Sequence, residues 1–280
     1  MKYVMLNNGL KMPELGIGTY DEAPSDAKRA VKFALQNGYR SIDTAHAYGN
    51  EQAVGEAIKE SGVDRKEIWL TSKLWPSDYD NALDAIEKML ERLGTDYIDL
   101  LYVHQPVGNF VGAWGEMEEA VKLGKVRTLG ISNFDANGYE EILSKATIKP
   151  AVIQLECHPF WQQTEMRKKL QRDNIVLESW FPLGGTMGNS ALFGNETILA
   201  IAKTHGKSPA QVILKWHLNE GFIAIPGSIK ENEILEDIDI YDFDLTEAEM
   251  NDIRSLEGTG RFFNMPFEEL KKFILNWKID

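Results

Sequence analysis

One stretch of the chain indicates the fold: Ile42-Asp43-Thr44-Ala45-His46-Ala47-Tyr48-Gly49-Asn50-Glu51. It begins as the end of a strand, passes through a loop that carries an acid and a phenol, and enters a helix with an acidic first turn. In a barrel of parallel strands, the reactive side chains lie at the carboxyl ends of the strands. The stretch therefore predicts that its loop lies on the catalytic face of such a barrel.

The same alternation of strand and helix continues along the rest of the chain. We predict eight strands, at Leu15–Thr19, Ser41–Thr44, Ile68–Lys73, Tyr97–His104, Val126–Ile131, Ala151–Glu156, Ile175–Trp180 and Phe222–Pro226. Helical patterns follow at Ser25–Gln36 (with Ser25 or Asp26 as N-cap), Glu51–Glu60, Asp80–Leu93, Trp114–Leu123, Gly138–Ser144 and Glu165–Asp173, and then up to Asn219. Strands that are each followed by a helix predict an α/β fold, the closed (β/α)8 or TIM barrel.

Further segments flank the predicted barrel. Asn8-Gly9 lies between two short apolar runs and predicts a β-hairpin with a two-residue primed turn, which would plug one end of the barrel. Beyond Asp244 a helical tail either covers the catalytic mouth or packs outside, and it carries the aromatic residues Phe262, Phe263, Phe267, Phe273 and Trp277. A length of 280 residues fits one barrel, so we expect residues 1–280 to form a single domain.

The composition argues against several classes of protein. With 43% hydrophobic and 26% charged residues the chain is typical of a globular protein, and no apolar run approaches the roughly 18 residues of a membrane helix. A formal charge of −13 repels polyanions, so we expect no nucleic-acid partner. The single cysteine and the lack of a signal-peptide pattern indicate a cytoplasmic protein, with a monomer as the default expectation.

Polar side chains fall at or just after the ends of successive predicted strands: Asp43 and Tyr48, then Lys73, then His104. Because neighbouring strands of a barrel are adjacent, we expect these side chains to converge. An ammonium group beside a phenol lowers the phenol's pKa, so Lys73, held by Asp43, would tune Tyr48 as an acid. A neutral His104 would hydrogen-bond a carbonyl oxygen. Such a set protonates an oxyanion but contains no good nucleophile, so the attacking species is expected from a cofactor.

These residues and their flanking motifs resemble the aldo-keto reductase family. The likeness runs from the entry hairpin to about Met250, and is close to bacterial members that reduce aldehydes and small ketones. It implies NAD(P)H-dependent reduction of aldehydes and ketones to alcohols, with Tyr48 as general acid, Lys73 and Asp43 as its tuning pair, and His104 orienting the carbonyl. The motifs that carry it are Ile42–Glu51, Thr71–Trp75, Tyr97–Pro106, Ile131–Phe134 and Gln154–Pro159.

The resemblance also implies where a nicotinamide cofactor binds. Ser132, Asn133 and Gln154 would hold the carboxamide, and Trp180 would stack on the ring; hydroxyls, amides and an aromatic face suit these tasks. The glycine-rich loop that begins at Leu183 and ends at Asn195 is expected to cover the pyrophosphate. The Rossmann glycine fingerprint is lacking, because Gly16-Ile17-Gly18 has no third glycine in register.

One departure from the family pattern bears on the choice of cofactor. After the eighth strand the family commonly places a lysine and then an arginine on the adenosine 2′-phosphate, whereas this chain has Gly227 and Glu233. Asp237 replaces a usual asparagine, which puts a further negative charge near the phosphate, and Lys230 is expected to compensate in part. We therefore expect weakened selectivity for NADP(H), so that NAD(H) also serves. The matching positions that keep the family's residues are Ser228 and Glu236.

Aromatic residues near strand ends are candidates for the wall of the substrate pocket, beside His104: Tyr20, His46, Trp75, Phe110, Trp114 and Trp161. Phe181 replaces the small residue that the family usually has beside the stacking aromatic. Cys157 and His158 are not expected to form a nucleophile–base pair, because neighbours on a strand face opposite sides. No pair of histidines has the spacing of a helical metal site, so we predict no metal.

Two other classes of function remain open. In a lyase, Lys73 would form a Schiff base with a carbonyl substrate, although Asp43 beside it disfavours this by keeping the amine charged. In a redox sensor, as in channel-associated relatives of the family, the chain would bind the cofactor without turnover. The complete set of four polar residues and the lack of an N-terminal extension favour an enzyme.

Overall fold

A computed structural model describes residues 1–277 and 279, and its centre is a parallel sheet of eight strands in the order β10-β9-β8-β7-β6-β5-β4-β3. The two outermost strands meet: Leu15 and Ala224 form a parallel bridge, and the Gly18 N–H donates to the Pro226 carbonyl at 2.9 Å. The sheet therefore closes, which confirms the predicted (β/α)8 barrel. The strands are β3 (Ile17–Gly18), β4 (Ser41–Asp43), β5 (Trp69–Leu74), β6 (Leu100–Val103), β7 (Leu129–Ser132), β8 (Val152–Glu156), β9 (Val176–Trp180) and β10 (Ile223–Ala224).

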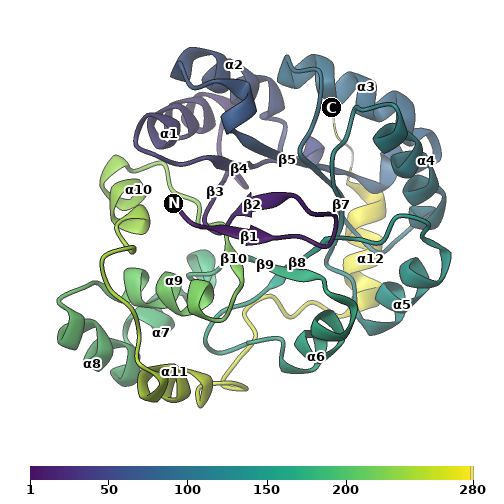
Figure 1. Ribbon diagram of the computed structural model, residues 1–280. Helices are drawn as coiled ribbons and strands as arrows, with labels where there is room; N and C mark the ends of the chain where they lie inside the picture. Colours follow the sequence, from purple (N-terminus) through teal and green to yellow (C-terminus); the bar gives the residue numbers. More distant parts are fainter. Residues whose placement is uncertain (278, 280) are drawn as a thin grey trace.

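Helices surround the barrel as an outer ring (Figure 1). The helices of the ring bury an apolar face toward the barrel; α3, for example, buries Ile86, Met89 and Leu93 and ends at Gly94, whose φ of 61° suits glycine. The α-helices are α1 (Pro24–Gln36), α2 (Glu51–Ser61), α3 (Ala82–Leu93), α4 (Phe110–Lys122), α5 (Ala136–Lys145), α6 (Thr164–Asp173), α7 (Gly185–Phe193), α8 (Glu196–His205), α9 (Pro209–Asn219), α10 (Glu231–Ile238), α11 (Glu247–Arg254) and α12 (Phe267–Asn276). Short 3-10 turns are η1 (His46–Tyr48), η2 (Arg65–Glu67) and η3 (Pro76–Asn81).

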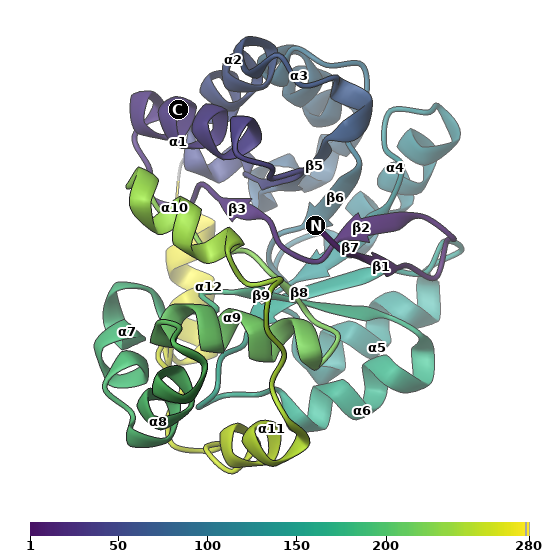
Figure 2. The same ribbon diagram turned by 60° about the vertical axis from the view of Figure 1, so that its left-hand side comes forward.

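Two helices that follow β10, α10 and α11, pack against other helices of this ring. In Figure 2, α11 lies beside α8, and α10 lies beside α9 and α1. Within the part of the chain that the structure describes, no helix is long and apolar enough to cross a membrane.

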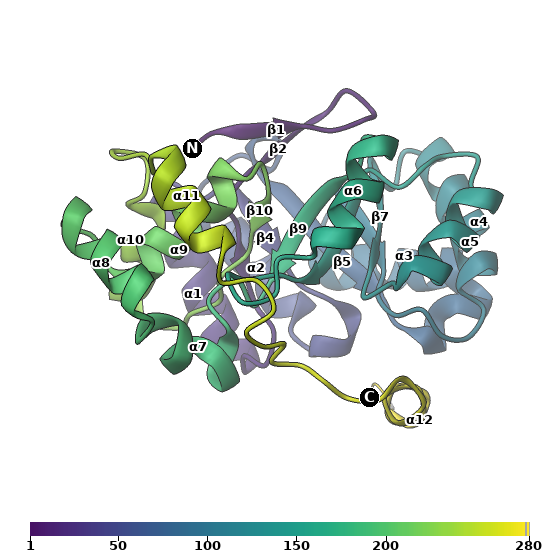
Figure 3. The same ribbon diagram turned by 90° about the horizontal axis from the view of Figure 1, so that it is seen from below.

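The two ends of the barrel are covered by different segments (Figure 3). The antiparallel hairpin of β1 (Tyr3–Met5) and β2 (Lys11–Pro13) lies over the end where the strands begin, and its Met12 packs on Trp69. The predicted plug is thus confirmed. At the opposite end α12 crosses the mouth, where Ile274 packs with Trp75. Both predicted courses of the C-terminal tail therefore occur: α11 packs outside on α8, and α12 covers the mouth.

Several local predictions are wrong. The hairpin turn is not a primed two-residue turn, because only Gly9 has a positive φ; the Gly9 N–H donates to the Leu6 carbonyl at 3.0 Å, which makes a three-residue loop closed by a left-handed glycine. The N-cap of α1 is Ala23, because Pro24 has the φ of a first helical residue.

Two further errors concern where helices begin. α4 starts at Phe110 rather than Trp114, because Asn109 caps it by accepting from the Gly112 N–H at 3.2 Å. The segment 183–195, predicted as a loop, contains α7, which starts after the left-handed Gly184.

Candidate active site

A buried ion pair lies at the carboxyl ends of β4 and β5. The Lys73 ammonium is fully buried and forms a short ion pair with Asp43 Oδ1. It also donates to the Tyr48 hydroxyl at 3.2 Å and to the Thr44 carbonyl at 2.9 Å. The structure therefore brings together three of the four residues that the strand ends single out, with the lysine at their centre.

His104, the fourth residue, lies beside Tyr48 at the end of β6. The Tyr48 and His104 rings meet edge to face with centroids 5.8 Å apart, and Trp75 also meets the imidazole edge to face, at 5.1 Å. Burial, and then the charge of Lys73, hold the pKa of His104 well below its usual value. The imidazole is therefore neutral at physiological pH, and its Nδ1 has no hydrogen-bond partner among the described residues.

Tyr48 differs from the sequence-based expectation. Burial raises the pKa of Tyr48 to about 12, and the opposing effect of Lys73 is too small to reverse this. The predicted net lowering of this pKa is therefore wrong for the protein without cofactor. A buried phenolate loses more stabilisation from water than it gains from the charge of the Lys73 ammonium. The consequence is that Tyr48 carries its proton at neutral pH.

The charge state of Lys73 follows from the same contacts. Burial by itself lowers the pKa of Lys73, but Asp43 and then Tyr48 outweigh it, so the net change is upward. The amine is therefore protonated, and a protonated amine does not attack a carbonyl carbon. This opposes the Schiff-base alternative on physical grounds.

A second group of polar side chains lies inside the barrel beneath the ion pair. Gln154 Nε2 donates to Asp43 Oδ2 at 2.9 Å and to Glu178 Oε2 at 2.6 Å, and the Tyr102 hydroxyl donates to the same Glu178 oxygen at 2.7 Å. Tyr102 fits there because residue 130 is glycine; a Cβ at that position would lie 2.4 Å from its ring. Sequence analysis did not single out Glu178 or Tyr102, although an acid and a phenol within apolar strands were a usable signal.

Three of the four residues predicted to hold the nicotinamide, Ser132, Asn133 and Trp180, are joined by hydrogen bonds, and the fourth, Gln154, lies on β8 between their strands. Asn133, in a left-handed conformation with φ 65°, donates to the Ser132 hydroxyl and to the His104 carbonyl, both at 3.2 Å. Its side-chain oxygen accepts from the Trp180 indole N–H at 2.9 Å, which fixes the plane of that ring. A hydroxyl, two amides and a fixed aromatic face at one rim fit the carboxamide and ring of a nicotinamide.

The residues predicted near the rest of the cofactor lie further round the rim. Leu183 precedes α7 and packs on the core, and Glu236 lies on α10. Ser228 follows β10 and donates to Glu233 at 2.6 Å, while Lys230 pairs with that carboxylate at 2.8 Å. Gly227 lies against the Gly18 carbonyl.

Only some of the candidate wall residues lie at the mouth. Tyr20 meets Tyr48 edge to face at 5.2 Å, Trp75 contacts His104, and Trp277 of the C-terminal segment packs over Trp75 at 5.7 Å. Trp277, one of the tail aromatics for which the sequence left the mouth or the outside open, therefore lies at the mouth.

The remaining candidates make other contacts. Trp114 is buried in the core and donates to Glu118 at 3.1 Å, so its prediction as a wall residue is wrong. Phe110 packs on Phe134 at 5.2 Å, and His46 pairs with Asp78 at 2.8 Å. Trp161 lies under Arg261 at 5.8 Å. Phe181 contacts both Tyr20 and Trp180 by its ring edges.

Cys157 has the properties of a core residue. It is fully buried, and burial raises the pKa of its thiol far above the usual value. The thiol is therefore protonated, in keeping with the prediction that Cys157 and His158 are not a nucleophile–base pair.

The fold and this site together define a barrel enzyme with a protonated phenol, a buried ammonium and a neutral imidazole at the carboxyl end of its strands. The chain belongs to the aldo-keto reductases: residues 14–257 match the model of the Aldo/keto reductase family. It is thus an oxidoreductase that reduces carbonyl groups, in a family that uses nicotinamide dinucleotides, and the resemblance stated from the motifs is confirmed.

Known relatives are similar along nearly the whole chain. A glyoxal reductase of Bacillus subtilis (strain 168) is 45% identical over 271 residues, which cover 95% of this chain and 97% of the relative. A 9,11-endoperoxide prostaglandin H2 reductase of Trypanosoma cruzi (strain CL Brener) is 40% identical, covering 94% of each chain. The crystal structure of MGS-M4, an aldo-keto reductase from a Medee basin deep-sea metagenome library, superposes with a TM-score of 0.90 at 38% identity, covering 94% of this chain and 100% of that one. These reductases lend no support to the lyase or sensor alternatives.

Proposed function

We propose that the protein reduces small aldehydes and ketones, dicarbonyls among them, with Tyr48 as the proton donor. The observation that carries this proposal is the 3.2 Å hydrogen bond from the buried Lys73 ammonium to the Tyr48 hydroxyl, beside a neutral His104. The similarity to a glyoxal reductase supports a small dicarbonyl as substrate.

Side chains of this chain supply the proton that the carbonyl oxygen receives. His104, neutral and with an unpartnered ring nitrogen, donates a hydrogen bond from its ring N–H to the oxygen of a carbonyl group placed over Tyr48. Tyr48 holds its proton until negative charge develops on the carbonyl oxygen, and then releases it. Lys73 is hydrogen-bonded to the phenol oxygen and stabilises the resulting phenolate, and Asp43 keeps the ammonium in place. General acid help of this kind supplies on the order of 10²- to 10⁴-fold in rate.

The cofactor fits the opposite side of the mouth. Ser132, Asn133 and Gln154 would hold the carboxamide of a nicotinamide, and Trp180 would stack on its ring. A reduced nicotinamide supplies hydride to the carbonyl carbon. Leu183, Ser228 and Glu236 would contact the remainder of the dinucleotide.

We expect a weakened preference for the phosphorylated cofactor, NADP(H), and Glu233 is its main cause. Its pKa is lowered by hydrogen bonds from Lys230 and Ser228, so it is ionised, and Lys230 is engaged with it rather than free for a phosphate. Asp237 contributes less than its sequence suggests, because burial raises the pKa of Asp237 to about 8 and leaves this carboxyl protonated at pH 7.

Absorbance at the nicotinamide band tests the function and the cofactor choice together. Purified protein would receive NADH or NADPH with a panel of aldehydes, dicarbonyls and sugar-derived ketones. We expect oxidation with either cofactor, at a ratio of kcat/KM below about 100-fold, which corresponds to about 2.7 kcal/mol. A larger preference for NADPH would contradict the weakened selectivity, and binding without turnover of any substrate would contradict the reductase.

A charge reversal sharpens the test of cofactor choice. Glu233→Arg restores a cation at the position in question, and we expect it to shift the ratio toward NADPH by about tenfold, or about 1.4 kcal/mol. Glu231→Arg, an exposed position on the same helix, adds the same charge nearby and serves as the matched control. An equal shift in both variants would show a general effect of charge rather than a contact of residue 233.

A further inference from the structure

Glu178 is a buried carboxyl group that the proposed reaction does not use. It lies on β9 directly beside Gln154 of β8, so both side chains enter the barrel interior. Its Oε2 accepts two hydrogen bonds, from Gln154 Nε2 at 2.6 Å and from the Tyr102 hydroxyl at 2.7 Å. Its Oε1 is buried and has no partner among the described residues.

The contacts of Gln154 determine which way its amide faces. Gln154 Nε2 carries two hydrogens, and both are directed at carboxyl oxygens, one at Asp43 at 2.9 Å and one at Glu178. A carboxylate accepts and does not donate, so the reversed amide would place its oxygen against two acceptors. The amide nitrogen is therefore held inside the barrel, and the carbonyl oxygen is the group left to face the rim.

We propose that Glu178 is a positioning residue for the nicotinamide carboxamide: it fixes the Gln154 amide so that its carbonyl oxygen accepts a hydrogen bond from the carboxamide N–H. This rests on the proposed function, which puts the carboxamide beside Gln154. Asp43 accepts from only one of the two N–H bonds, so without Glu178 the second would be buried without an acceptor and the inward orientation of the amide nitrogen would be less stable. Glu178 is thus linked to the reacting groups through Gln154, Asp43 and Lys73.

The environment of Glu178 argues for a task beyond filling the core. It is completely buried, and no cation among the described residues forms an ion pair with it; burial, and then Asp43, raise its pKa to about 7. Burying an acid in this way costs stability that an apolar side chain would not. The orientation of Gln154 survives protonation, because a proton on Oε1 leaves Oε2 free to accept both bonds.

A cofactor analogue tests this directly. In the 3-acetylpyridine form of a dinucleotide the carboxamide is replaced by an acetyl group, which keeps the carbonyl and lacks the N–H donors. Binding of each oxidised dinucleotide would be followed by quenching of tryptophan fluorescence, since Trp180 lies at the site. We expect the wild type to bind the carboxamide form about three- to tenfold more tightly, the range of one net hydrogen bond.

The variants separate positioning from general support of the structure. Glu178→Leu removes the acceptor and should reduce the preference to within about twofold of unity, whereas a merely structural role would weaken both dinucleotides equally and leave the ratio unchanged. Glu178→Gln keeps an acceptor oxygen for Gln154 and should retain the wild-type preference for the carboxamide form. Tyr102→Phe removes the other hydrogen-bond donor to Glu178 Oε2, and this variant should keep the wild-type preference for the carboxamide form.

The outcomes are distinguishable from a failure of the proposed function. A wild-type preference that persists in Glu178→Leu would overturn the positioning role, as would loss of the preference in Glu178→Gln. If thermal unfolding shows that Glu178→Leu does not fold, Glu178→Asp repeats the test, because its shorter side chain withdraws the acceptor from Gln154. If the wild type binds neither dinucleotide, the proposed function itself fails, and the positioning role with it.

Discussion

Buried carboxylates lie at both ends of the barrel, and their surroundings differ. At the end where the strands begin, Asp99 is paired with Arg65 at 2.8 Å and with Arg127 at 2.7 Å, and it accepts from the Leu70 N–H at 3.0 Å. At the other end Asp43 is paired with Lys73, which also donates to the Tyr48 hydroxyl. The first arrangement neutralises a buried charge completely, and the second leaves a donor for a reacting group.

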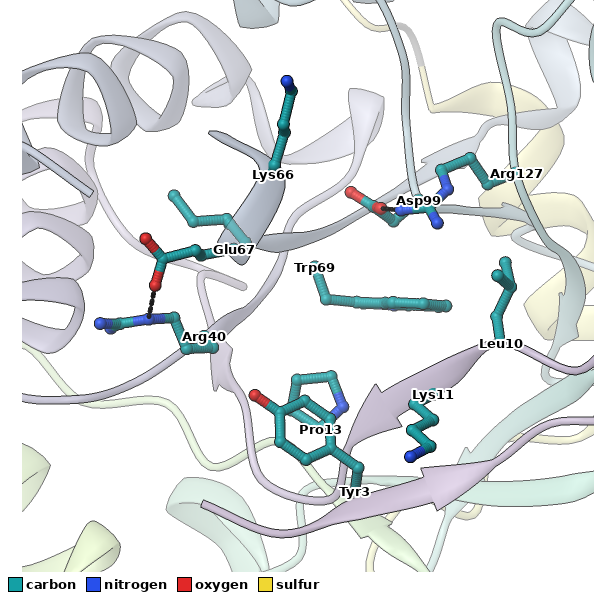
Figure 4. A pocket seen from close by; sticks show the side chains of 11 residues that line it. Tyr3, Leu10, Lys11, Pro13, Arg40, Lys66, Glu67, Trp69, Asp99 and Arg127 are labelled. Atoms are coloured by element: carbon teal, nitrogen blue, oxygen red, sulfur yellow. Dashed lines mark hydrogen bonds and ion pairs between the residues drawn. The ribbon is translucent and has the colours of Figure 1, made fainter. Parts of the chain in front are cut away.

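The space beside each carboxylate makes the same distinction. Next to Asp99 lies a cavity of about 280 Å3 under the hairpin, with Trp69 across it (Figure 4). Both acids that line this cavity are paired with arginines, Glu67 with Arg40 at 3.7 Å and Asp99 with Arg127 at 2.7 Å. At the mouth, His104 Nδ1 and Glu178 Oε1 have no partner among the described residues. Trp69 Nε1 beside Asp99 also has no partner among the described residues. The two ends therefore differ in the kind of unsatisfied group: an imidazole and a carboxyl can exchange protons, whereas an indole N–H only donates a hydrogen bond.

The largest effect is expected from breaking the pair at the mouth. Lys73→Met leaves Asp43 buried without its cation, which costs on the order of 3–5 kcal/mol of unfolding free energy, and it also removes the group that stabilises the Tyr48 phenolate. Urea unfolding and steady-state turnover would be measured on the same preparation. Full activity in a stable Lys73→Met protein would contradict the role of this lysine.

The pH dependence of stability provides the next test. The pKa of Glu178 is about 7 in the folded protein against an ordinary 4.5, so the folded state keeps a proton that the unfolded state releases. Stability is therefore lost as pH rises from about 4.5 to 7, by about 3 kcal/mol at 1.36 kcal/mol per pKa unit. We expect Glu178→Gln to gain on the wild type by this amount between pH 4.5 and 8 in urea unfolding. A difference that does not change with pH would show that Glu178 is ionised throughout.

At the end of the barrel where the strands begin, we expect a smaller effect, which changes stability and not activity. Asp99→Asn keeps the shape of the side chain but weakens its bonds to two arginines, and we expect a loss of about 1–3 kcal/mol of unfolding free energy. The kcat/KM should stay within about twofold of the wild type, because the strand-start end of such barrels serves stability. A large loss of activity without a loss of stability would remove the distinction between the two ends.

Much of the fold was predictable because the alternation of strand and helix is regular. Strands that are apolar on both faces and helices that stop at glycines such as Gly94 leave few other arrangements. Asp43, Tyr48, Lys73 and His104 were found for the same reason, since they follow the ends of adjacent strands. Their roles remain proposals that the experiments above address.

Other features depend on tertiary contacts that no local pattern contains. Glu178 meets Gln154 and Tyr102, which are 24 and 76 residues away along the chain. The direction of the Tyr48 pKa shift depends on how Tyr20 and His104 enclose the phenol. The turn at Gly9 and the start of α7 after Gly184 depend on left-handed glycines, whose sequence signature also fits an ordinary loop.

The central claim is that Tyr48 donates the proton, and one comparison tests it most directly. The kcat/KM for a small dicarbonyl would be measured for the wild type, Tyr48→Phe and Tyr20→Phe, with cofactor binding followed by fluorescence. Tyr20→Phe is the matched control, because it removes a hydroxyl from a ring in edge contact with Tyr48. We expect Tyr48→Phe to lose about 10²- to 10⁴-fold while it still binds cofactor, and Tyr20→Phe to lose only a few-fold. A Tyr48→Phe enzyme that retains activity within about tenfold of the wild type would contradict the account.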